Sequence, residues 1–256
     1  FVCPHSAIRA RAFDAAAAKD APPTFKHVPA KSKDFPVGTH ISYQTAPEDC
    51  TGCGDCVEAC PIHDKSNVSR RAVNMAPIAP LLDQERDNLA FFLRLPEFDR
   101  GAIKHNTIPS AMLLDPLFEF SGACAGCGET PYIRLATQLF GDRMLIANAT
   151  GCSSIYGGNL PTTPWAKDAN GLGPAWSNSL FEDNAEFGLG MRLTVDKQNE
   201  YARELVKGFE KELSAELVNA ILNAVQPDEA GIEEQRERVA ELKKSLGKSS
   251  DNRAKD

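Results

Sequence analysis

The chain has 256 residues, of which 42% are hydrophobic, and its formal net charge at pH 7 is −7. That length can bury at least one core and suggests one or two domains. The acidic charge and the lack of a basic stripe argue against nucleic-acid binding, which relies on Lys and Arg to neutralise phosphates. The sequence has no apolar run of about 18 residues and no leader pattern at its start, so we expect a soluble, cytoplasmic protein without a membrane partner.

The first part of the chain shows few signs of regular structure. Residues 9–45 are rich in Ala, Lys and Pro, and prolines interrupt any long helix, so we interpret this stretch as an insertion or linker. Between residues 64 and 116, short apolar pieces alternate with prolines. This pattern is typical of an irregular connector on a larger body, and we expect it to join two domains.

A second unit is expected to begin near Phe118. A loop with cysteines is followed by a helical pattern over residues 131–140 and by an apolar run over residues 144–149 that indicates a buried parallel strand. This order predicts an α/β layer. Residues 157–190 are rich in Gly, Pro, Asn and Trp, which predicts an irregular segment that lines a site. Apolar residues at helical spacing then predict packing helices within residues 201–222 and 232–246.

The eight cysteines are grouped rather than scattered: Cys3, Cys50, Cys53, Cys56, Cys60, Cys124, Cys127 and Cys152. An even count also fits a disulfide scaffold. Disulfide-dense folds, however, are mostly small secreted domains, whereas this chain is long enough to fold without such bridges. The short spacing within each group favours metal ligation.

The first group forms the run C-x2-C-x2-C-x3-C-P, which is typical of bacterial ferredoxins with two 4Fe-4S clusters. In such runs the first three cysteines bind one cluster and the fourth binds the other, so we expect Cys60 to ligate a second cluster. Cys3 is followed by Pro4, like the end of an earlier run of the same kind, so we expect Cys3 to complete the cluster of Cys50, Cys53 and Cys56. Cys60 then lacks three partners, so we expect the chain to be truncated at its start.

Zinc is the main alternative for this first group. Zinc sites usually take their four ligands as two separated pairs, and the successive x2 spacing does not suit that arrangement. Inert buried thiols are a weaker alternative still. His5 and His63 flank the motif and are candidates for tuning a cluster by hydrogen bonding, whereas we expect His27, His40 and His105 to be solvated.

The second group consists of Cys124 and Cys127 in a Gly-rich loop and Cys152 after the expected strand. By itself this spacing also fits a redox-active C-x2-C pair or a zinc site with a further ligand elsewhere. Glu129 follows two residues later, where a carboxylate at the start of a helix can accept hydrogen bonds while Gly lets the backbone approach a flat ring. An ordinary acidic residue at a helix start is the alternative for Glu129.

The segments GACAGCGETPY, NATGCSSIYGG, TPW and AWSNSLFEDNAEFG resemble the pyruvate:ferredoxin oxidoreductase family, and the resemblance covers essentially the whole chain. It implies α/β structure with a partial, α+β ferredoxin-like two-cluster domain over residues 1–70. A connector over residues 71–115 and the first part of a thiamine diphosphate-binding α/β domain over residues 116–256 would follow.

The same resemblance implies roles for the second group. Cys124, Cys127 and Cys152 would be three ligands of the cluster nearest thiamine diphosphate, the fourth ligand lying beyond this chain. Glu129 matches a cofactor-contacting position, and Thr150, Gly151 and Cys152 would lie beside the cofactor.

The family oxidises pyruvate to acetyl-CoA and CO2 and passes single electrons through three 4Fe-4S clusters to ferredoxin or flavodoxin. The resemblance therefore implies pyruvate, coenzyme A and such a carrier as partners, and a homodimer. The Mg2+ that holds the diphosphate needs a G-D-G motif, but Gly141 and Asp142 are followed by Arg143, which predicts only a turn. We therefore expect no Mg2+ ligand and no catalytic residue in this chain, and we expect it to be inactive alone.

Three alternatives remain: another 2-oxoacid oxidoreductase, a ferredoxin-type electron carrier without thiamine chemistry, and a zinc-stabilised interaction module. The electron carrier leaves the second cysteine group unexplained.

Overall fold

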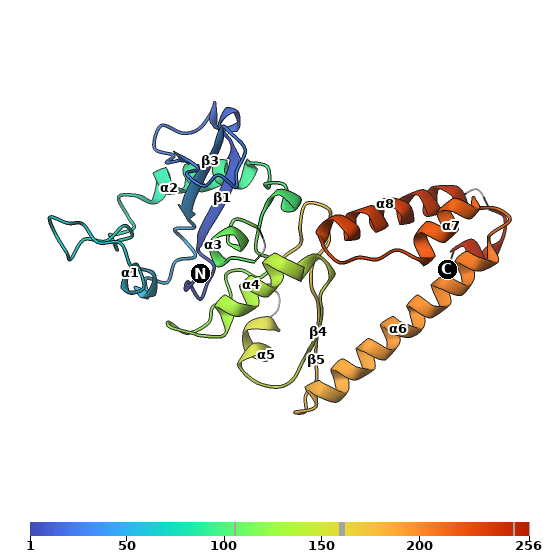
Figure 1. Ribbon diagram of the computed structural model, residues 1–256. Coiled ribbons are helices and arrows are strands. Elements are labelled where there is room, and N and C mark those ends of the chain that lie inside the picture. Colours follow the sequence, from blue (N-terminus) through green and yellow to red (C-terminus); the bar gives the residue numbers. More distant parts are fainter. Residues whose placement is uncertain (105, 159–161, 248, 256) are drawn as a thin grey trace. The chain divides into compact units, whose positions relative to one another are not determined.

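The computed structural model describes residues 1–104, 106–158, 162–247 and 249–255. The chain forms two compact units, Phe1–Glu182 and Asp183–Asp256. The first is mixed α and β and contains all eight cysteines, and the second is helical in its described residues (Figure 1).

The segment that we interpreted as a linker contains an antiparallel sheet. Strands β1 (Ile8–Asp14), β3 (Thr39–Thr45) and β2 (Val28–Pro29) lie in the order β1-β3-β2, with β3 in the middle. Ala12 of β1 faces Ile41 of β3 in this register. Residues 9–45 are therefore not a simple linker, because much of this stretch forms a sheet.

The reason for this difference lies in the side chains of β1, which alternate between arginine and alanine. The alanines of this strand form an apolar face, but the opposite face carries two arginines, and five of the seven residues are nevertheless buried. Arg9 forms an ion pair with Glu119, and Arg11 forms one with Asp115. Buried charges are tolerated when they are paired and hydrogen-bonded, so the sheet forms although its sequence is polar.

Both faces of the sheet pack against the connector. On one face Phe13 packs in a hydrophobic cluster with helix α2 (Leu82–Arg94). The buried members of this cluster are Phe13, Phe25, Phe91, Phe92 and Leu95. On the other face Ala10 and Ala12 pack with Ile103, Leu113 and Leu114. The connector is therefore less irregular than expected, because α2 spans 13 residues within it.

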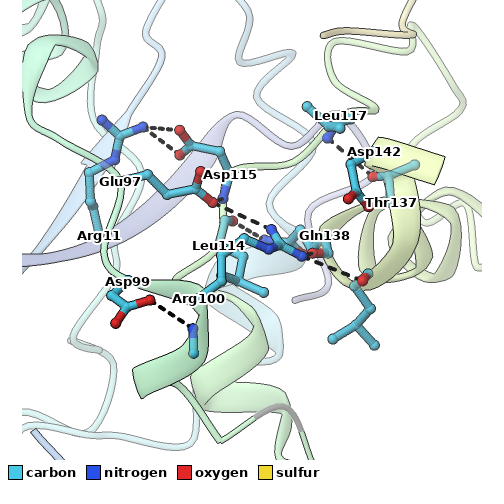
Figure 2. Close-up of polar contacts among 12 residues, drawn as sticks. Arg11, Glu97, Asp99, Arg100, Leu114, Asp115, Leu117, Thr137, Gln138 and Asp142 are labelled. Carbon is cyan, nitrogen blue, oxygen red and sulfur yellow. Dashed lines mark hydrogen bonds and ion pairs between the residues drawn. The ribbon is translucent and has the colours of Figure 1, made fainter. Parts of the chain in front are cut away.

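The end of the connector is bonded to helix α4 (Thr130–Phe140) by polar groups rather than by apolar packing alone (Figure 2). The buried Gln138 side chain donates to the Leu114 carbonyl at 2.6 Å, and Thr137 Oγ1 accepts from the Leu117 amide at 3.2 Å. Arg100 donates to the Gln138 carbonyl at 2.9 Å. The short helix α3 (Ile108–Ala111) lies in this part of the connector.

The predicted helix and strand of the second cysteine group are confirmed. Helix α4 is followed by a 3-10 turn at Gly141–Arg143, as expected, and then by strand β4 (Leu145–Asn148). β4 pairs in parallel with β5 (Ala175–Asn178), which lies inside the stretch that we expected to be irregular. β4 is not buried as expected, since Leu145 is 55% exposed.

The second unit contains helices α6 (Asn184–Gly208), α7 (Ala215–Leu222) and α8 (Glu229–Leu246). The helical spacing over residues 201–222 is thus divided between α6 and α7, and the second predicted helix is confirmed as α8. Their core consists of Val206, Phe209, Leu213, Leu217, Val218 and Ile221. Ser214 and Asp228 cap α7 and α8 by accepting hydrogen bonds from backbone amides.

His27 and His40 are half-buried rather than solvated, and their Nδ1 atoms lie 2.6 Å apart. His105 lies outside the described residues. No helix within the described part of the chain is long and apolar enough to cross a membrane.

We expect Arg11→Ala to lower the free energy of unfolding by about 3 kcal/mol, because it leaves Asp115 and the backbone carbonyls at the end of α2 without their donor. Urea denaturation followed by circular dichroism measures the change. The control is Arg86→Ala, which removes an exposed pair with Glu48 and should have little effect. Equal losses in both variants would show that the buried arginine is not a structural requirement.

Candidate iron-sulfur centre

The first cysteine group lies in a tightly curled loop that ends in the short helix α1 (Asp55–Glu58). Gly52 and Gly54 have φ angles of +72° and +87°, a left-handed conformation that residues with a Cβ rarely adopt. These two glycines allow the backbone to reverse between consecutive cysteines.

The structure brings Cys3 together with the first three cysteines of the run, although Cys3 lies on a separate segment. One cavity is lined by four cysteines: Cys3, Cys50, Cys53 and Cys56. His5 and Met75 are among the other residues that line it. Cys60 does not line it. This division of the motif is the one that the crossed ligation of two-cluster ferredoxins requires.

The donor set fits a 4Fe-4S cluster, which takes four cysteine thiolates. The cavity volume is about 20 Å³, about the space of one water molecule. Among the residues that the structure describes, no group of three or more His, Cys, Asp or Glu side chains is arranged to hold a metal ion. The cysteines share a cavity wall but do not form a preformed site for a single ion.

The sulfur environment of Cys60 also differs from that of Cys56. Burial, and then the neighbouring Cys3, Cys50 and Cys53, raise the pKa of the Cys56 thiol. By contrast, the pKa of the Cys60 thiol is lowered. The main cause is a backbone hydrogen bond at Ile62, and Arg71 contributes less. The thiols that share the cavity therefore repel one another as thiolates, which a positively charged iron core would relieve.

In the second group, Cys127 lies just before α4 and Cys152 begins helix α5 (Cys152–Gly157). Burial raises the pKa of Cys127, but backbone hydrogen bonds at Thr130 and Glu129 outweigh it, so the pKa is lowered. The start of a helix thus favours the thiolate that metal ligation needs. Cys124 is exposed, and its carbonyl accepts a hydrogen bond from the Cys127 amide at 3.1 Å.

Tyr156 was not identified from the sequence and connects the second group to Glu129. Its hydroxyl donates to Glu129 Oε1 at 2.7 Å, and its side chain is 8% exposed. Burial, the hydrogen bond to Glu129, and the nearby Cys127 and Cys152 all raise the pKa of Tyr156. The phenol therefore stays protonated and orients one oxygen of an otherwise exposed carboxylate. No sequence pattern marks this residue, because the pairing depends on how α5 packs.

Thr150 and Gly151 form the turn between β4 and α5. Thr150 Oγ1 donates to the Ser179 carbonyl at 3.2 Å, and the Gly151 amide donates to Ser154 Oγ at 3.2 Å. Asn178 on β5 accepts from the same Ser154 hydroxyl at 2.9 Å. These bonds fix the turn on which Cys152 lies, and the roles of Thr150 and Gly151 toward a cofactor remain predictions.

Comparison with known proteins finds one matching family and several longer relatives. The 4Fe-4S binding domain family matches residues 43–63, which include Cys50, Cys53, Cys56 and Cys60. Over 96% of its length the chain is 60% identical to a pyruvate-flavodoxin oxidoreductase of Nostoc sp., of which it covers 20%. It is 53% identical over 95% of its length to a probable pyruvate-flavodoxin oxidoreductase of Escherichia coli, of which it also covers 20%.

A pyruvate:ferredoxin oxidoreductase of Moorella thermoacetica is 48% identical over 84% of the chain and 18% of that protein. The chain thus spans about a fifth of the length of these relatives. These identities confirm the resemblance inferred from the motifs around the second cysteine group. Over nearly its whole length the chain matches a segment of the pyruvate-flavodoxin and pyruvate:ferredoxin oxidoreductases.

Proposed function

We propose that the chain is the part of a pyruvate-oxidising enzyme that carries electrons away from the thiamine site. The observation that carries this proposal is the cavity lined by cysteines from two separate segments. Cys3, Cys50, Cys53 and Cys56 would hold one 4Fe-4S cluster, and Cys60 would ligate a second. Cys124, Cys127 and Cys152 would supply three ligands of a third, closest to thiamine diphosphate.

Iron-sulfur clusters supply one-electron carriers when bound, and the protein sets their positions and potentials. The residues of this chain contribute thiolates, closely approaching backbone amides and partial burial. We assign Glu129, with Thr150, Gly151 and Cys152, to contact with thiamine diphosphate. Tyr156 orients the Glu129 carboxylate through the hydrogen bond described above. The Mg2+ ligands and the residues that select the substrate belong outside this chain.

The proposed whole reaction is the oxidative decarboxylation of pyruvate to acetyl-CoA and CO2, with ferredoxin or flavodoxin as electron acceptor and a homodimer as the assembly. Domain boundaries follow the sequence interpretation: a partial ferredoxin-type domain over residues 1–70, a connector over residues 71–115 and the first part of a thiamine diphosphate domain over residues 116–256.

Free cysteines that must stay reduced to bind iron suit a reducing compartment, so we propose a cytoplasmic location.

A ferredoxin-type carrier without thiamine chemistry is the second candidate. It would account for the 4Fe-4S binding domain match over residues 43–63. It would not account for the matched segment around Cys124, Cys127 and Cys152, nor for the identity that extends over 96% of the chain. The thiamine-linked function is therefore better supported.

Anaerobic reconstitution of the chain should give one stable cluster with about four irons, because one site has all four of its thiolates. Cys56→Ala should abolish the stable cluster. Cys60→Ala should leave it, although the two cysteines belong to the same motif, because Cys60 lies outside the shared cavity. Iron and sulfide analysis with EPR measures both variants. Loss of the cluster in Cys60→Ala with retention in Cys3→Ala would refute the assignment of Cys3.

In the full-length enzyme, Glu129→Ala should weaken thiamine diphosphate binding about tenfold to a hundredfold, the effect of losing one hydrogen bond to a charged group. Tyr156→Phe should weaken it less, about threefold to tenfold, because it frees the carboxylate without removing it. Calorimetric titration gives the affinities, and EPR should count the same clusters in both variants. Normal affinity in Glu129→Ala would remove this residue from the cofactor site.

A further inference from the structure

The two cysteine groups are joined by a set of hydrogen bonds, which we call the joint, between residues 4–6 and residues 118–123. The Ser6 hydroxyl donates to the Phe118 carbonyl at 3.2 Å, and the Phe120 amide donates to the His5 carbonyl at 2.8 Å. The Ser121 hydroxyl donates to the Pro4 carbonyl at 2.9 Å. The chain just after Cys3 is therefore bonded to the chain just before Cys124.

His5 is the side chain at the centre of the joint. Its side chain is only 4% exposed, and its ring lines the cavity of the first four cysteines. Nε2 lies 2.6 Å from the Ala123 carbonyl, and since a carbonyl only accepts, this nitrogen carries the proton. Nδ1 lies 3.4 Å from the Thr51 hydroxyl. The ring thus contacts the residue that follows Cys50 and the residue that precedes Cys124.

These contacts give His5 a role other than the tuning of a cluster by hydrogen bonding that the sequence suggested. Both ring nitrogens are directed at backbone or hydroxyl oxygens that belong to the two cysteine loops. His63, at the other end of the first motif, has its Nδ1 3.0 Å from the Val68 carbonyl and lies outside the joint. The two flanking histidines are therefore not equivalent.

A second contact holds the other end of the same loop. Asp55 Oδ2 accepts a hydrogen bond from the Gly126 amide at 2.6 Å and one from the Cys53 thiol at 3.4 Å. Once Cys53 ligates iron it has no thiol proton, so the Gly126 bond is the one that persists. With Ala123 held by His5 and Gly126 held by Asp55, the loop that carries Cys124 is fixed at both ends.

We propose that His5 is a positioning residue for electron transfer: it holds the Cys124 loop against the cavity of Cys3, Cys50, Cys53 and Cys56. The inference rests on the proposed function, since it needs clusters at both places. In the step concerned, a cluster on the second group loses one electron and the cluster on the first group gains it. No bond is broken and no proton moves.

The physical reason is that the protein contributes orientation and separation rather than chemistry to such a step. The rate of such a step falls as the separation of the two carriers grows, so a loop that moves away from the first cluster slows it. A buried imidazole with hydrogen bonds on two sides is rigid, and replacing it leaves the Ala123 carbonyl without its donor. The loop then gains freedom to move away from the first cluster.

The test compares His5→Phe, His5→Gln and the matched control His63→Phe in the full-length enzyme with its clusters reconstituted. In His5→Phe, the magnetic interaction between the two reduced clusters should be lost from the EPR spectrum. Electron passage after rapid mixing with pyruvate should slow, while the iron content stays unchanged. The Phe120 amide keeps its bond to the His5 backbone carbonyl, but its hydrogen exchange should rise about tenfold, because the joint around it loses the bond from the ring to Ala123. His5→Gln should retain all of these properties, because its amide can donate to Ala123, and His63→Phe should match the unmodified enzyme.

An enzyme without iron in the unmodified form would refute the proposed function. Full iron content with an unchanged magnetic interaction in His5→Phe would refute the inference alone. If His5→Phe does not fold, Asp55→Ala and Asp55→Asn decide: the alanine variant should lose the interaction, and the asparagine variant, which still accepts from Gly126, should keep it. Equal behaviour of these two variants would overturn the proposal.

Discussion

Two buried arginines on β1 determine how the first unit is arranged. Arg9 pairs with Glu119 and donates to the Ser6 carbonyl at 2.9 Å, and Arg11 pairs with Asp115. A buried guanidinium is costly unless its partners are in place, so these pairs select one position for the chain between the connector and the second cysteine group. That position lies just before Cys124, so the arginine pairs adjoin the chain that carries the second cysteine group.

The cysteine chemistry depends on that arrangement at two levels. Within each group, glycines with positive φ let short loops curl, as at Gly52 and Gly54. Between groups, the joint centred on His5 and the contact from Asp55 to Gly126 hold the loops together. Electron transfer needs carriers that are both tuned and close, and the fold provides closeness through backbone hydrogen bonds between distant segments.

Much of the candidate site could be predicted from the sequence, because ligand spacing is a local property. The spacing of the cysteines from Cys50 to Cys60 predicted a 4Fe-4S site. Crossed ligation predicted that Cys3, but not Cys60, would lie with Cys56, and Cys3 lines the same cavity. The sheet could not be predicted, because β1 is buried through arginine pairs with acids about a hundred residues away. Tyr156 and the role of His5 were missed for the same reason, since each depends on a tertiary contact that no local pattern encodes.

The central claim is that cysteines from two separate segments hold a 4Fe-4S cluster in the first unit. The most direct measurement is iron X-ray absorption on the anaerobically reconstituted chain. The account predicts iron with sulfur neighbours only in its first shell and a clear iron-iron scattering contribution, as a cubane cluster requires. Isolated metal ions without a metal-metal contribution, or tightly bound zinc in place of iron, would contradict it.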